Sequence, residues 1–188
     1  MQKKWQRLHS KTIADLRLFE ARIDTLRNPK NGETVDVTIL TGGDSVNVLA
    51  ITDENNAVLV DNYRFGTSSY LLELPGGMVD AGEDHQQAAK RELLEETGYT
   101  AKEWFYAGCV AANPVFQDSF VHHYLALGAA KTGETELDDA EDIEVRETQV
   151  EEVRKMLFSG AFMHPHSISG ILRGLVVMDG EKENKSNV

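Results

Sequence analysis

The chain has 188 residues, of which 41% are hydrophobic and 27% are charged, values typical of a single globular domain. Its formal net charge of -12 disfavours nucleic acid as a partner, because phosphate backbones are bound mainly by Lys and Arg. The N-terminus has no apolar stretch typical of a signal peptide, and no apolar run approaches the ~20 residues of a membrane span, so we expect a cytoplasmic protein without a membrane partner.

The N-terminal part of the chain is expected to form an extension to the main domain. Residues 1–12 show no pattern and are expected to be an irregular lead-in. From Phe19 to Asp24, apolar and charged residues alternate, which predicts a half-buried strand. A second alternating run from Val35 to Ile39 follows the turn signal Asn31-Gly32, and two such runs predict an antiparallel hairpin. We therefore expect residues 1–45 to form a strand and hairpin extension that could serve as a dimerisation element.

The middle of the chain contains strand-like runs and one amphipathic helix. The runs at 46–52 and 57–65 are rich in apolar and β-branched residues, and a shorter apolar run lies at 71–74. Over 86–97 the apolar period lengthens to that of a helix. Acidic residues before this helix suit the positive end of its dipole, and Gly98 suits a left-handed C-terminal cap.

The C-terminal part is expected to complete a mixed sheet and add two helices. A capping-box pattern at Thr148–Glu151 predicts the start of a helix. The single cysteine, Cys109, is expected to be a small buried hydrophobe. The order of elements favours an α+β protein, with a main domain at 46–180 and a disordered tail at 181–188. The further elements expected are strands at 104–112 and 119–127, a polar loop at 131–142, and helices from 148 to about 158 and from about 165 to 178.

Three glutamates in the predicted helix carry the main chemical signal. Glu92, Glu95 and Glu96 are three and four residues apart, so they share one helix face. Three like charges on one face are unfavourable unless cations neutralise them, and hard cations such as Mg²⁺ prefer oxygen ligands. Arg91 can orient these carboxylates by bidentate pairing, and the glycines at 76–82 let the backbone approach closely. The alternative for the glutamates alone is a solvated acidic face.

The stretch from Gly77 to Tyr99 resembles the Nudix box, which reads Gly, five residues, Glu, seven residues, then Arg-Glu-U-x-Glu-Glu-x-Gly-U, where U is a bulky aliphatic. Tyr99, which stands at the last aliphatic position, is the one departure. The resemblance implies a Nudix-type α/β/α sandwich with a mixed β-sheet, and Mg²⁺ as the cofactor with Mn²⁺ as a possible substitute. It also implies roles for particular residues: metal ligation by Glu92, Glu95, Glu96 and the Gly76 carbonyl, and fixing of the loop–helix geometry by Arg91 and Glu83.

Residues outside the box are similar to the nucleotide-sugar branch of the family. A Tyr-Arg pair before a Glu-Leu-Pro-Gly-Gly turn implies that Arg64 contacts a diphosphate and that Glu73 contributes to the substrate pocket. The alternative for Arg64 is a surface salt bridge. Pro114 stands where ADP-ribose pyrophosphatases carry a proline, although its surroundings differ and an ordinary loop proline is the alternative. Glu141, in the acidic loop, is the candidate general base, with Asp139 and Glu144 as alternatives.

The resemblance implies a hydrolase acting on a phosphoric anhydride bond, with ADP-ribose cleaved to AMP and ribose 5-phosphate. The alternatives are other nucleotide sugars such as GDP-mannose, nucleoside triphosphates, dinucleoside polyphosphates, or a non-catalytic domain that senses ADP-ribose. Nucleotide-sugar members are usually homodimers, in which the hairpin contributes to the partner's site. Catalytic or metal roles for His122, His123, His164 and His166 are possible, but oxygen-ligand chemistry does not require them.

Overall fold

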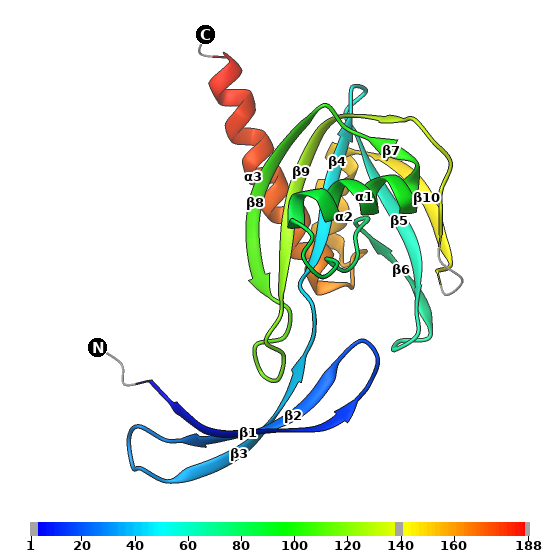
Figure 1. Cartoon of the computed structure of the whole chain (residues 1–188). Helices are drawn as coiled ribbons and strands as arrows, with labels where there is room; N and C mark the ends of the chain where they lie inside the picture. Colours follow the sequence, from blue (N-terminus) through cyan, green and yellow to red (C-terminus); the bar gives the residue numbers. More distant parts are fainter. Residues whose placement is uncertain (1–3, 138–140, 187–188) are drawn as a thin grey trace. The chain divides into compact units, whose positions relative to one another are not determined.

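The computed structural model describes residues 4–137 and 141–186, and the chain forms two compact units (Figure 1). The first unit contains the segment that ends at Asp44 together with Ala111–Phe120. The second contains Ser45–Val110 and the chain from Val121 onward. Residues 111–120 join the first unit through contacts such as the Leu40 N–H donating to the Phe116 carbonyl at 2.7 Å.

The first unit is built on an antiparallel sheet of order β1-β2-β3, which confirms the predicted hairpin. Its strands are β1 (Gln6–Asp15), β2 (Glu20–Arg27) and β3 (Thr34–Thr41). The expected irregular lead-in at 1–12 is wrong, because residues from Gln6 onward pair with β2. Partner strands satisfy the backbone hydrogen bonds of β1, so this strand forms although its side chains are mostly exposed and show no alternation.

The second unit is built on a seven-stranded mixed sheet of order β10-β5-β4-β9-β7, with β6 paired to β5 and β8 paired to β9. β4 and β9 run parallel, whereas β5 is antiparallel to β4, β6 and β10. The strands are β4 (Ser45–Thr52), β5 (Asn56–Arg64), β6 (Ser69–Glu73), β7 (Tyr99–Thr100), β8 (Glu103–Ala111), β9 (Phe120–Lys131) and β10 (Ile143–Gln149).

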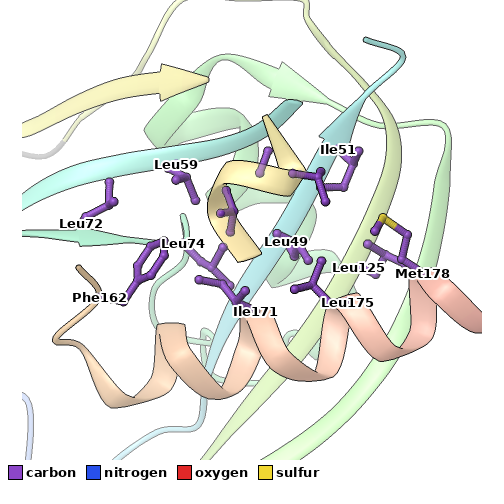
Figure 2. Packing of buried hydrophobic residues seen from close by; sticks show 13 residues of the cluster. Leu49, Ile51, Leu59, Leu72, Leu74, Leu125, Phe162, Ile171, Leu175 and Met178 are labelled. Atoms are coloured by element: carbon purple, nitrogen blue, oxygen red, sulfur yellow. The ribbon is translucent and has the colours of Figure 1, made fainter. Parts of the chain in front are cut away.

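Helices cover both faces of this sheet, which confirms the α/β/α sandwich. α1 (His85–Thr97) packs on one face, and α2 (Val150–Ser159) and α3 (Pro165–Ser186) pack on the other. The alternation of β4 explains why both faces need cover: Val48 packs in the α1 cluster, whereas Leu49 packs against Ile171 and Leu175 of α3 (Figure 2). A central strand buried on both faces thus holds α1 and α3 at fixed positions.

Three local expectations are wrong. The capping box does not form, because the N-cap of α2 is Gln149, which makes no side-chain capping bond. Cys109 is exposed, since it lies on the outer side of β8. α3 continues past Gly180 to Ser186, through most of the expected disordered tail. A glycine inside a helix costs only about 1 kcal/mol relative to Ala, and the Glu and Lys residues that follow Gly180 favour a helix.

Among the described helices, none is both long and apolar enough to cross a membrane.

Candidate active site

α1 begins one residue before the predicted helix at 86–97 and ends as predicted, with the predicted left-handed cap at Gly98. Asp84 is the N-cap, and its Oδ1 accepts from the backbone N–H of Gln86 at 2.9 Å. Gly98 is the left-handed C-cap, with φ 74°, and its N–H donates to the Leu94 carbonyl at 2.7 Å. Because Leu93 is buried against the sheet, the Glu92–Glu96 side of the helix is directed toward the loop before α1.

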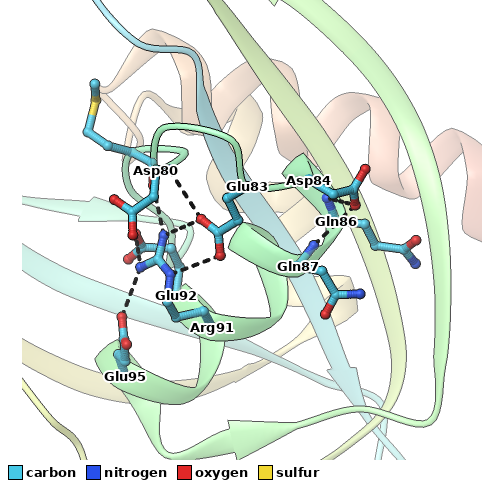
Figure 3. A network of polar contacts seen from close by, with 9 residues as sticks. Asp80, Glu83, Asp84, Gln86, Gln87, Arg91, Glu92 and Glu95 are labelled. Carbon is cyan, nitrogen blue, oxygen red and sulfur yellow. Dashed lines mark hydrogen bonds and ion pairs between the residues drawn. The ribbon is translucent and has the colours of Figure 1, made fainter.

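Arg91 is the centre of a polar network between that loop and α1 (Figure 3). Its guanidinium donates to both carboxylate oxygens of Glu83, at 3.2 and 3.0 Å, and to the Met78 carbonyl at 2.9 Å. It also donates to Glu92 at 2.8 Å and to Glu95 at 3.0 Å. The pKa of Arg91 is raised, first by the Glu83 hydrogen bond and then by those to Glu92 and Glu95. The structure thus places Arg91 in contact with Glu83, and the contacts join the loop to the helix.

Arg91→Lys is expected to lower kcat/KM by about 100-fold, because an ammonium cannot reach these four groups at once in the way a planar guanidinium does. Initial rates with the best substrate would check this, and circular dichroism would check the fold. Arg146→Lys is the matched control, since Arg146 makes one exposed pair with Asp61 at 3.5 Å. Equal rates for both variants would contradict the role given to Arg91.

Glu92 and Glu96 are buried acids. They are 8% and 4% exposed, and Glu96 Oε2 accepts from the Gly76 N–H at 2.7 Å. Burial raises the pKa of Glu96 to about 8, and the Gly76 hydrogen bond opposes this shift only in part. The pKa of Glu92 is also raised, mainly by burial and against the effect of Arg91. Burial is thus the main cause that disfavours the ionised form of each carboxylate.

The glycines before α1 allow the loop to pack closely against its neighbours. A Cβ at Gly76, whose φ is 153°, would lie 2.1 Å from the Val46 carbonyl oxygen. A Cβ at Gly77 would lie 2.6 Å from Glu92 Oε1. The loop is further held by the Val46 N–H, which donates to the Gly77 carbonyl at 2.9 Å. Gly76 therefore contacts Glu96 through its N–H, and metal binding by its carbonyl stays a prediction.

The donor set suits a hard divalent cation in its chemistry. Glu92, Glu95 and Glu96 are oxygen donors on one helix face, and burial leaves two of them short of positive charge. Among residues 4–137 and 141–186, however, no three acidic, His or Cys side chains already surround a common point. Arg91 instead bonds Glu92 and Glu95. Each bond uses one oxygen of its carboxylate, Oε1 of Glu92 and Oε2 of Glu95, and these bonds leave the other oxygen of each as a possible donor to a cation.

Arg64 and Glu73 form a bidentate ion pair in which the Arg64 side chain is 41% exposed and the carboxylate is buried. Arg64 Nε and Nη2 donate to the two oxygens of Glu73, each at 2.8 Å, and Glu73 is 1% exposed. The Glu73 hydrogen bond is the main cause that raises the pKa of Arg64, and the charges of Glu96 and Glu141 add to it. The structure thus brings Arg64 within electrostatic range of the buried acids. His164, which the sequence did not link to Glu73, lies 3.2 Å from Glu73 Oε2.

The remaining candidates fall in different places. Glu141 adds to the raised pKa values of Glu92 and Glu96, so its charge acts on the site. Glu144 is exposed on β10, and Asp139 lies outside the described residues. Pro114 belongs to the first unit, whereas the acids belong to the second, so its role stays a prediction.

Comparisons with known proteins agree on one family. The sequence model of the NUDIX domain matches residues 42–166. An ADP-ribose pyrophosphatase of Bacillus subtilis (strain 168) is 34% identical over 157 residues, which cover 81% of this chain and 85% of the relative. A methanol dehydrogenase activator of Bacillus methanolicus is 34% identical over 148 residues, covering 76% and 80%. The crystal structure of an ADP compounds hydrolase has a TM-score of 0.84 at 23% identity, covering 96% of this chain and 97% of that one, which shows the same fold.

Proposed function

The chain belongs to the NUDIX family and is a Nudix hydrolase, and on that basis we propose that it hydrolyses the diphosphate bond of a nucleoside diphosphate sugar. ADP-ribose, cleaved to AMP and ribose 5-phosphate, is the proposed substrate. The observation that carries this proposal is the bidentate pairing of Arg64 with the buried Glu73, three residues before Gly76, whose N–H bonds the buried Glu96. A diphosphate needs both an anion-binding group and cation-binding acids side by side. The similarity to the ADP-ribose pyrophosphatase of Bacillus subtilis supports the choice of sugar.

We propose Mg²⁺ as the cofactor, with Mn²⁺ as a substitute, held by Glu92, Glu95, Glu96 and the Gly76 carbonyl. A bound divalent cation supplies charge neutralisation of the phosphates and polarisation of the attacking water. The chain's own groups do the rest. Arg91 fixes the positions of the glutamates relative to the loop before α1. Arg64 binds the diphosphate, and Glu141 accepts the proton of the attacking water.

A product assay on the purified protein tests this function. The substrates are ADP-ribose, ADP-glucose, GDP-mannose, a dinucleoside polyphosphate and a set of nucleoside triphosphates, each with Mg²⁺ and with EDTA. We expect AMP release from ADP-ribose to exceed every other reaction and to stop in EDTA. Preference for a different substrate would refute ADP-ribose as the substrate but not the hydrolase activity. Activity that persists in EDTA would overturn the cofactor, and binding of ADP-ribose without cleavage of any substrate would favour a sensor.

We also propose a homodimer that uses the first unit. Large apolar side chains are exposed on its β1–β2 hairpin, and exposed apolar patches of this kind usually mark interfaces. Light scattering is expected to give twice the chain mass of 20.9 kDa, and Leu18→Glu is expected to shift the protein toward monomer. A monomer at micromolar concentration would contradict the proposal. The exposed residues are Leu8, Ile13, Leu16 and Leu18.

A further inference from the structure

We propose that His164 is a positioning residue of the active site, which acts through Glu73 to fix the guanidinium of Arg64. This inference rests on the proposed function, because it assumes that Arg64 binds the diphosphate. His164 lies just before α3, far from both partners in the sequence, and no pattern in the chain links it to them. Three observations carry the inference: the burial of Glu73, the direction of the Arg64 pair, and the anchoring of the first turn of α3.

Glu73 is a carboxylate with almost no access to water, so protein donors must satisfy its oxygens. Arg64 supplies two of them, from Nε to Oε1 and from Nη2 to Oε2. In this side-on pairing, Nε and Nη2 face Glu73. The Nη1 nitrogen is directed away from Glu73, so Nη1 can bind an anion. His164 Nδ1 lies 3.2 Å from Oε2, the same oxygen that accepts from Arg64 Nη2. The imidazole therefore limits the movement of the end of the carboxylate to which Arg64 is bound.

Burial disfavours the charged form of the His164 ring. Its pKa is lowered mainly by burial, and the charges of Arg64 and His166 lower it further against the effect of Glu73. A carboxylate only accepts hydrogen bonds, so the imidazole can donate to Glu73 only when Nδ1, which also contacts Ser167 Oγ at 3.2 Å, carries a proton. The lowered pKa of His164 favours Arg64 over His164 as the cationic partner of Glu73.

The first turn of α3 is fixed to the strands beside the active-site loop. Ser167 Oγ accepts from the Leu74 N–H at 3.2 Å and lies 3.2 Å from His164 Nδ1. Asn47 of β4 donates through Nδ2 to the His166 carbonyl at 2.9 Å. Leu74 directly follows Glu73, and β4 pairs with the loop at Gly77. These contacts fix the position of His164 relative to Glu73 and to the loop. A histidine on a mobile loop could not orient a buried carboxylate, whereas this one can.

Two substitutions at His164 separate positioning from packing. Asn carries a donor nitrogen close to the place of His Nδ1, whereas Leu fills the space without a donor. We expect His164→Leu to raise KM for the best substrate about 10-fold with a smaller change in kcat, and His164→Asn to stay within about 2-fold of the wild type. His9→Leu is the matched control, because His9 is exposed on β1, in the other unit of the chain. Equal losses in the Leu and Asn variants would overturn the inference.

A double-mutant cycle tests whether His164 acts through Arg64. In an Arg64→Gln background, His164→Leu is expected to raise KM no further, because the group that it positions is gone. Additive effects would show a separate structural role and overturn the inference. The nuclear magnetic resonance signal of the Arg64 Nε–H offers a readout without substrate: it should exchange slowly in the wild type and His164→Asn, and fast in His164→Leu. If the wild type cleaves no substrate, the proposed function fails, and this signal still decides whether His164 restrains Arg64.

Discussion

Glu96→Gln is expected to lower kcat by at least about 1,000-fold while the protein stays folded. Gln keeps the size of the side chain and can still accept from the Gly76 N–H, but it removes the negative charge. A divalent cation would lose its most buried carboxylate ligand. Steady-state rates with ADP-ribose and Mg²⁺, beside circular dichroism, would measure both parts of the expectation. Glu151→Gln is the control, since Glu151 is exposed in the first turn of α2. Near-normal turnover in Glu96→Gln would refute the metal assignment.

The same variant has an expected effect on stability. Because the pKa of Glu96 is raised from 4.5 to about 8, the metal-free fold favours the protonated acid. The stability that Glu96 contributes is therefore complete below pH 4.5 and is lost as the pH rises through about 8. In EDTA, the wild type should become less stable over this range, whereas Glu96→Gln should change less. Urea denaturation at pH 5 and pH 9 would measure the free energy of unfolding of the wild type and of Glu96→Gln. Equal pH dependence of the two proteins would show that Glu96 is not held as a buried acid.

Gly76→Ala is expected to abolish most activity and to lower the free energy of unfolding by roughly 3 kcal/mol. The new Cβ would lie 2.1 Å from the Val46 carbonyl oxygen and 2.6 Å from the Asn47 Cα, so it would meet backbone that cannot move alone. The positive φ of 153° adds strain for any residue with a side chain. The loop would have to leave β4, and with it the N–H bonded to Glu96.

Gly66→Ala is the matched control for this prediction. A Cβ at Gly66 would meet no atom within 4 Å, and no positive φ disfavours a side chain there. We expect this variant to keep the activity and the unfolding midpoint of the wild type. Urea denaturation would measure the stability of both variants, and initial rates would measure their activity. If Gly76→Ala behaved like Gly66→Ala, the close approach of the loop to β4 would not be needed for function.

The site could be predicted from the sequence wherever its signals are local. The box spacing places three glutamates on one helix face, and the caps at Asp84 and Gly98 follow from rules that act within one turn. The alternating residues of β2 and β3 predict their hairpin for the same reason. The family resemblance follows from the spacing of the box, and the α+β class follows from the order of strands and helices.

Only the tertiary structure decided the features that depend on a distant partner. β1 has no alternation of its own and becomes a strand because β2 supplies its hydrogen bonds. The Thr148 capping box gives way to β10, which extends to Gln149 through its pairing with β5. The contact of His164 with Glu73 exists because α3 packs across β4 and β6. Local sequence determines the period, the caps and the chemical donors, whereas burial and long-range pairing determine which of those donors meet and how their pKa values shift.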